Sequence, residues 1–183
     1  QLGEFADDRH RTNFETLLVQ KHPREILVLG DESPLAPSAQ SWTLMKAVLM
    51  SNCIVMRRKP GADSFPDAEQ TARLLREKRY FASDRLVPED EAKDWPPVLR
   101  DARARLPLAF GAFGAAVLYL CDLKLDRALL PVRNFRVYEH SNSAVSMVLD
   151  GQTLRNLDVL SNSVSGGLEG TLMLAVDHTK TAF

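Results

Sequence analysis

Apolar and polar residues near the start of the chain follow the period of a helix. Phe14, Leu17 and Leu18 share one face at helical spacing. The preceding Asp7 or Asp8 can accept the free amide hydrogens at the beginning of that helix. This pattern predicts a capped amphipathic helix.

The pattern then changes to short apolar runs. Residues 26–29 form an unbroken apolar run, which is typical of a strand covered on both faces of a parallel sheet. A second run at residues 53–56 predicts another strand, and residues 1–6 are interpreted as the end of a third. A helix is predicted between the two runs, at residues 37–50.

Ser64 and Asp67 have the spacing of a capping box, which predicts a helix from there to residue 81. Short links between alternating strands and helices indicate an α/β layer with right-handed crossovers. A polar segment with prolines at residues 82–97, including the acidic run at 89–91, is interpreted as a linker.

Beyond the linker the pattern is mainly helical. Helices are predicted at residues 98–121, with a break at Pro107, and at 150–160 and 169–182. Short extended pieces are predicted at 134–139 and 146–149. The predicted fold class is therefore α/β plus all-α.

Composition places the chain among ordinary globular proteins. It has 183 residues, of which 45% are hydrophobic and 26% charged, and its net charge is -1. Such a balance gives no basic field for non-specific DNA binding. The apolar stretch at 106–121 is shorter than the roughly 20 residues that span a bilayer, so we expect a buried helix and no membrane. Both chain ends are expected to be cuts through a longer protein.

Catalytic motifs are missing from the sequence. It contains no phosphate-binding loop, and its four histidines have no metal-ligand spacing. Asp7, Asp8, Glu15 and Asp31 are the carboxylates that an RNase H-like nuclease could use to hold two metal ions. Asp7 and Asp8 lie where a helix needs caps, and no acid interrupts an apolar strand. We therefore predict no catalytic, cofactor-binding or metal-binding residue.

Five strings of residues resemble the MutS mismatch-repair family, and the first two are most similar to the mispair-recognising subunit of the eukaryotic MutS-homologue heterodimer. They occur in family order across nearly the whole chain. The strings are EFADDRH at 4–10, FPDA at 65–68 with the segment that runs to YF at 80–81, LAFGAFG at 108–114, MVLD at 147–150 with TLRNL at 153–157, and EGTL at 169–172 with VDHTKTAF at 176–183.

The resemblance implies two domains. Residues 1–95 would be most of an RNase H-like connector domain with its linker, and residues 96–183 would begin the helical lever domain. The family's Phe-x-Glu mispair wedge and its ATPase loop are absent here. The implied role is a non-catalytic fragment that couples ATPase state to movement of the clamp on mismatched DNA, with ATP and Mg bound outside this segment. Implied partners are a second MutS homologue and a MutL-type protein, in the nucleus.

Four residues are candidates for structural or coupling roles. Asp150 would cap the helix that contains Asn156, and Asp177 near a helix end needs a partner or a further segment to cap. Phe113 would fill space on a helix whose small residues allow close packing, and Phe113→Ala should cost about 3–5 kcal/mol if the ring is buried.

Apolar faces at 108–120 and 169–183 are expected to be only partly buried. The alternative functions for this chain are a self-standing RNase H-like nuclease and a protein-interaction module.

Overall fold

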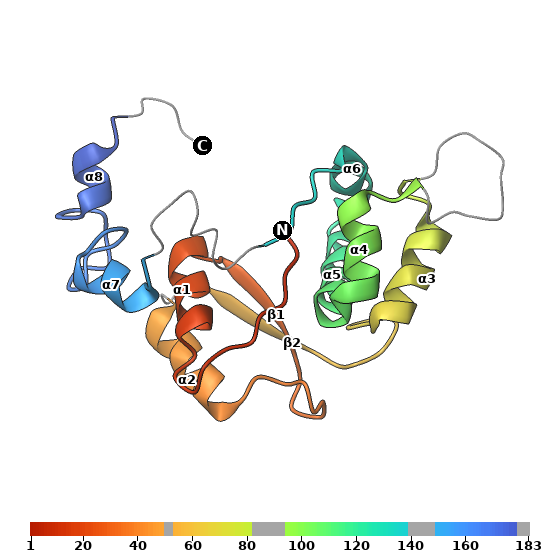
Figure 1. Cartoon of the computed structure of the whole chain (residues 1–183), viewed down its shortest axis with the longest axis horizontal. Helices are drawn as coiled ribbons and strands as arrows, with labels where there is room; N and C mark the ends of the chain where they lie inside the picture. The colour runs from red at the N-terminus through yellow and green to blue at the C-terminus, as the bar shows by residue number, and fades with distance from the viewer. Residues whose placement is uncertain (50–52, 82–93, 139–148, 179–183) are drawn as a thin grey trace. The chain divides into compact units, whose positions relative to one another are not determined.

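The structure is a computed structural model that describes residues 1–49, 53–81, 94–138 and 149–178 (Figure 1). The two strands among these residues pair in parallel as a small sheet. A mixture of helices with a small parallel sheet agrees with the predicted mixed fold class. In chain order the elements are α1 (Thr12–Lys21), β1 (Glu25–Leu29), α2 (Ala39–Val48), β2 (Ile54–Arg58), α3 (Ala68–Lys78), α4 (Pro97–Arg105), α5 (Pro107–Asp122), α6 (Asp126–Leu129), the 3₁₀ helix η2 (Leu130–Val132), α7 (Gly151–Asn156) and α8 (Leu172–Val176).

The chain divides into two compact units, each assembled from separate stretches. Unit 1 comprises Gln1–Phe5, Leu27–Ala36 and Val55–Glu139, and unit 2 comprises Ala6–Ile26, Pro37–Ile54 and His140–Phe183. The predicted boundary between residues 95 and 96 separates the connector and lever domains that the family resemblance implies. That boundary stays a prediction. The predicted linker and the extended piece at 146–149 lie mostly outside the described residues.

β1 and β2 occur where apolar runs predicted strands, but the burial predicted for the first run is wrong. No residue of either strand is buried. An apolar run shows that the side chains are hydrophobic, but it does not show whether other parts of the chain cover them. The predicted strand at residues 1–6 is replaced by a single bridge, in which the amide of Leu2 donates to the Arg136 carbonyl at 2.9 Å.

The core of unit 1 forms where α3 and α4 pack on α5 (Figure 1). Aromatic rings fill much of it: Phe110 is fully buried beside Trp95, with ring centroids 6.2 Å apart. Phe113 is half-buried, and its ring meets Phe135 edge-on at 5.5 Å. Phe110 and Val117 of α5 are fully buried, while Leu108 is 58% exposed, so the predicted partial burial of the apolar residues of α5 is confirmed.

The approach of α3 to α5 depends on Gly114. A Cβ atom at this position would lie 2.1 Å from Thr71 Oγ1 and 2.6 Å from Pro66 Cγ. No side chain fits in that space, so the glycine sets the distance between the two helices. This confirms the prediction that small residues in this segment allow a neighbouring helix to approach closely.

α3 begins three residues later than the sequence predicted, because its N-cap is Asp67 and not Ser64. Asp67 is the N-cap residue and accepts the Gln70 amide hydrogen at 2.8 Å, while the Gln70 side chain accepts the Asp67 amide hydrogen at 3.0 Å. The capping box is therefore Asp67 with Gln70, and the predicted box of Ser64 with Asp67 is wrong. The helix ends at Lys78 because Arg79 adopts φ 51°, before the predicted residue 81.

α4 and α5 are separate helices because Pro107 interrupts them, as predicted. No single helix in the described part of the chain is long and apolar enough to cross a membrane. α5 passes such a test only together with Asp126–Val132, as a pair bent by 117°. The buried apolar side chains of α5 belong to the core of unit 1.

The short helix α6 was not predicted, and a buried polar contact fixes its start. The Tyr80 hydroxyl donates to Asp126 Oδ2 at 2.8 Å and lies 3.2 Å from Cys121 Sγ. Burial raises the pKa of Tyr80, while the hydrogen bond from Tyr80 lowers the pKa of Asp126. The contact joins the residues after α3 to the beginning of α6.

The last predicted helix is much shorter than residues 169–182. Gly170 has φ +78°, and the Thr171 side chain then caps α8 by accepting the Leu174 amide hydrogen at 3.2 Å. α8 has no buried residue, which confirms that the apolar face of this segment is incompletely covered. Residues 179–183 lie outside the described part.

Replacing Gly114 with Ala should lower the free energy of unfolding by about 1–3 kcal/mol, since the added methyl group overpacks the α3–α5 contact. Alanine is the better helix former by roughly 0.5–1 kcal/mol, so at a helix position with free space the same substitution would raise the free energy of unfolding. Urea denaturation of the 183-residue chain measures the change. Gly167→Ala is the control, because its nearest atom would be 3.7 Å away. A Gly114→Ala chain as stable as the wild type would contradict this packing.

Phe113→Ala should cost about 1–3 kcal/mol, below the roughly 3–5 kcal/mol expected for a fully buried ring, because Phe113 is only half-buried. Phe110→Ala, at a fully buried position, should cost more than Phe113→Ala. The same denaturation measurement compares the two variants. Equal losses, or a larger loss at Phe113, would show that the aromatic core is arranged differently.

Candidate functional site

Helices α1 and α7 of unit 2 meet at Thr16 and Gly151. The Thr16 side chain is 2% exposed, and its hydroxyl accepts the Gly151 amide hydrogen at 2.9 Å. The same hydroxyl donates to the Thr12 carbonyl oxygen at 2.8 Å, one turn earlier in α1. Both hydrogen-bonding capacities of this buried group are therefore used between the two helices.

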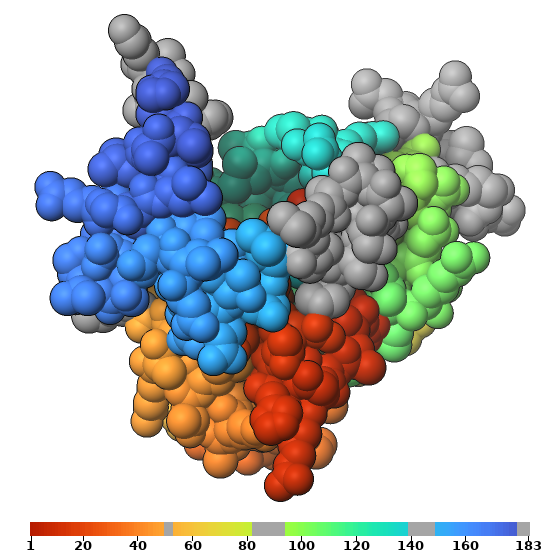
Figure 2. Space-filling model, turned by 60° about the vertical axis from the view of Figure 1, so that its left-hand side comes forward, coloured from red at the N-terminus to blue at the C-terminus, as the bar shows by residue number. Residues whose placement is uncertain are grey.

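Gly151 also allows the two helices to touch. A Cβ atom there would lie 3.0 Å from both Glu15 Cγ and the Thr16 backbone nitrogen. Because backbone cannot move aside as a flexible side chain can, a larger residue would push α7 away from α1. In Figure 2 the beginning of the blue C-terminal region lies directly against the red N-terminal region of this unit.

An ion pair borders this contact. Arg155 Nη2 donates to Glu15 Oε1. The side chains are unequally covered: Glu15 is 13% exposed and Arg155 is 39% exposed. A charge-assisted hydrogen bond with one largely buried partner is stronger than an exposed pair, and removing Arg155 would leave the Glu15 carboxylate without it.

The start of α7 is set by Asp150. Its Oδ1 accepts the Thr153 amide hydrogen at 2.6 Å, and this bond lowers the pKa of the carboxyl. The predicted cap is confirmed. Because Gly151 follows the cap directly, Asp150 also determines where the Gly151 amide points.

The start of α1 is set by Asp7 and Asp8. The Asp7 carboxylate accepts the amide hydrogens of Asn13 and Phe14, both at 3.0 Å. Asp8 accepts the Thr12 amide hydrogen at 3.0 Å, which lowers its pKa. The predicted capping role of these two acids is confirmed.

The carboxylates considered for nuclease chemistry thus have structural partners. Asp7 and Asp8 cap α1, Glu15 pairs with Arg155, and Asp31 pairs with Arg57 at 2.8 Å. In the described part of the chain, no group of three or more His, Cys, Asp and Glu side chains could hold a metal ion.

The other candidate residues do not gather at one place. Asn156 is exposed at the last position of α7, and Asp177 is exposed at the C-cap of α8, where its amide donates to the Met173 carbonyl at 2.8 Å. Phe113 belongs to unit 1. Coupling roles for Asn156, Asp177 and Phe113 stay predictions.

Sequence reasoning missed the contact that brings α1 and α7 together. Thr16 and Gly151 are far apart in the sequence, and neither belongs to a recognised motif. A polar residue on the inner face of an amphipathic helix was the one available signal, because a buried hydroxyl requires a partner.

No family model matches the chain. It is 34% identical to the DNA mismatch repair protein MSH6 of Saccharomyces cerevisiae over 94% of its length. It is 32% identical to Msh6 of Homo sapiens over its full length, and 42% of it is 35% identical to the MutS protein of Parasynechococcus marenigrum.

The chain spans a small part of these relatives: 13% of the yeast protein, 15% of the human protein and 8% of the cyanobacterial protein. The similarity to the Msh6 proteins nevertheless extends along nearly the whole of this chain. The chain therefore belongs to the MutS family of DNA mismatch-repair proteins, and its sequence is Msh6-like.

Proposed function

We propose that this chain is the connector and the beginning of the lever of an Msh6-like protein, and that it transmits movement between them without catalysing a reaction. The Msh6 similarity along the chain supports this assignment. In the proposed division, residues 1–95 are an RNase H-like connector and residues 96–183 begin the lever. ATP and Mg bind elsewhere in the longer protein.

The contact between α1 and α7 carries the proposal. α1 lies in the proposed connector and α7 in the proposed lever. They are joined by the Thr16–Gly151 hydrogen bond and the Glu15–Arg155 ion pair, and a Cβ at Gly151 would lie only 3.0 Å from the backbone nitrogen of Thr16. Packed contacts of this kind have discrete arrangements, so displacement of α7 must either carry α1 with it or break these bonds.

Partners of the longer protein follow from the family. A second MutS homologue would complete a heterodimer, mismatched DNA would bind through other domains, and a MutL-type protein would respond to the nucleotide-dependent state. The proposed location is the nucleus, because the most similar proteins include Msh6 of yeast, human and chicken.

The nuclease alternative is not favoured, since its candidate carboxylates already serve as caps and ion-pair partners. A protein-interaction role is compatible with coupling, and it does not explain why residues so distant in sequence are tied together.

Coupling can be tested by breaking the ion pair in the full-length protein together with its partner subunit. Arg155→Glu should slow ATP-triggered release from mispaired DNA by roughly threefold or more, because it adds a second acid beside Glu15. Mispair affinity without nucleotide should stay unchanged. Stopped-flow release of a labelled mispaired duplex measures the rate.

Two further variants control this experiment. Combining Arg155→Glu with Glu15→Arg restores opposite charges and should recover the release rate. Arg9→Glu makes the same charge change at an exposed residue and should have no effect. Normal release in Arg155→Glu, with α7 shown by hydrogen exchange to be loosened, would contradict the coupling role.

The isolated 183-residue chain should show no ATPase activity and no magnesium-dependent nuclease activity on RNA–DNA hybrids, because it lacks a phosphate loop and its acids are structurally engaged. Homoduplex and mispaired DNA should bind it equally weakly. Turnover that disappears in an Asp7→Asn, Asp8→Asn variant, or a reproducible preference for a G–T mispair, would overturn this expectation.

A further inference from the structure

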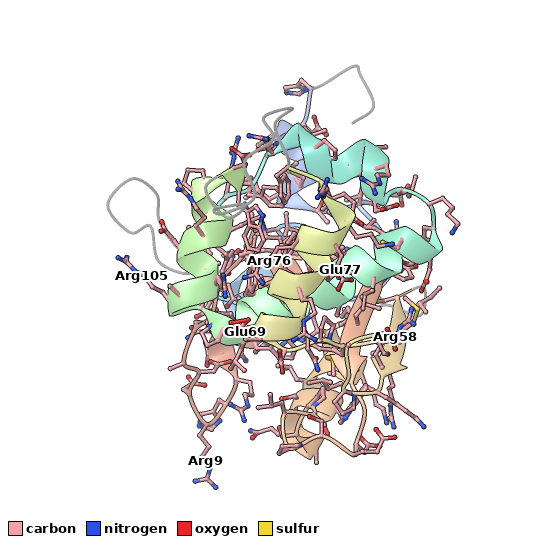
Figure 3. The ribbon with its side chains drawn as sticks, turned by 90° about the vertical axis from the view of Figure 1, so that its right-hand side faces the viewer. Arg9, Arg58, Glu69, Arg76, Glu77 and Arg105 are labelled. Carbon is pink, nitrogen blue, oxygen red and sulfur yellow. The ribbon has the colours of Figure 1, made fainter. Side chains whose placement is uncertain are left out.

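The two outer helices of unit 1, α3 and α4, form a surface that the coupling role does not use. Arg103 Nη2 donates to Glu69 Oε1 at 2.8 Å. Glu69 lies near the start of α3 and Arg103 near the end of α4, so this ion pair bridges the border between two helices that both pack on α5. We name this border the α3–α4 seam; Figure 3 shows it with Glu69 and Arg76 on the side of α3 that faces α4.

Helical spacing brings further arginines to the seam. Arg73 and Arg76 follow Glu69 by one and two turns on the same face of α3. Arg100 precedes Arg103 by one turn on the same face of α4. Arg73 and Arg100 are exposed, and Arg76 is half-buried.

The charge of the seam is unbalanced. Within the described part of the chain, Arg103 has a carboxylate partner at the seam, while Arg73, Arg76 and Arg100 form no ion pair. The other acids of the two helices do not compensate. Glu77 lies on the side of α3 away from α4 in Figure 3, and Asp101 is on the opposite face of α4 from Arg103 by helical spacing.

We propose that the α3–α4 seam docks an acidic segment of a partner protein, whose carboxylates bind Arg73, Arg76 and Arg100. The guanidinium group presents paired N–H donors in a planar fork that matches a carboxylate. Because the arginines come from two neighbouring helices, one acidic peptide lying between α3 and α4 could place its carboxylates against both. The inference is independent of the coupling role proposed above.

Nucleic acid fits the seam less well. Single strands bind where exposed aromatic rings stack on bases, and neither α3 nor α4 contains an aromatic residue. The nearby rings of Tyr80, Trp95 and Phe110 are buried in the core. Duplex DNA requires a broad field that neutralises many phosphates, whereas the net charge of the chain is -1.

The test uses the 183-residue chain and a fluorescein-labelled oligoglutamate peptide, with binding followed by fluorescence anisotropy. We expect saturable binding, and at least about tenfold weaker binding to an Arg73→Gln, Arg76→Gln, Arg100→Gln variant, because charge-assisted hydrogen bonds are lost. Circular dichroism and thermal unfolding verify that the variant is folded.

A matched variant, Arg9→Gln, Arg24→Gln, Lys59→Gln, removes the same charge from exposed residues outside both helices and should bind the peptide like the wild type. Equal weakening in both variants would overturn the proposal, because the attraction would then be non-specific. Absence of saturable binding would also overturn it. Tighter binding of an oligothymidine of equal charge would identify the surface as a nucleic-acid site instead.

Discussion

The hydrogen bond from the Gly151 amide to the Thr16 hydroxyl is the contact on which the arrangement of α1 and α7 depends. Breaking it would leave a buried donor and a buried acceptor unpaired, and such groups are costly in the interior. The caps at the two helix starts serve this contact, since Asp7 and Asp8 determine the register of α1 and Asp150 determines that of α7.

The same physical device recurs in unit 1, where a missing side chain allows two helices to touch. Gly114 leaves room for Thr71 and Pro66 of the α3 region. Thr71 Oγ1 is buried there without a hydrogen-bond partner among the described residues, so the contact is one of shape. In both units a glycine makes the approach possible, and in unit 2 a polar group also specifies it. We therefore interpret unit 1 as a packed support that displays the α3–α4 seam.

Local signals in the sequence predicted most helix positions. The acids before α1, Pro107 between α4 and α5 and Asp150 before α7 act on neighbouring residues, so their effects could be read directly. The start of α3 was predicted too early because Ser64 and Asp67 also have the spacing of a capping box. In the structure the capping box is formed by Asp67 and Gln70. The start of the last helix was placed too early, because Gly170 has a positive φ and Thr171 then caps a helix that begins at Leu172.

Contacts between distant residues could not be predicted in this way. Nothing near Glu15 in the sequence identifies Arg155 as its partner, and Glu15 was considered as a nuclease acid instead. Likewise Glu69 and Arg103 are 34 residues apart in the sequence, and their ion pair became visible only in the structure. The candidate site was therefore predicted only in part: the cap at Asp150 was found, while Thr16, Gly151 and Arg155 became visible as one contact only in the structure.

Hydrogen exchange in the full-length protein tests the central claim most directly. The amide of Gly151 and the amides of α1 should change their protection together when ATP binds to the protein on mispaired DNA, because the Thr16–Gly151 hydrogen bond couples opening of one helix to opening of the other. A nucleotide-dependent change in α7 with constant protection throughout α1 would contradict the account, since movement of the lever would then not reach the connector through this contact.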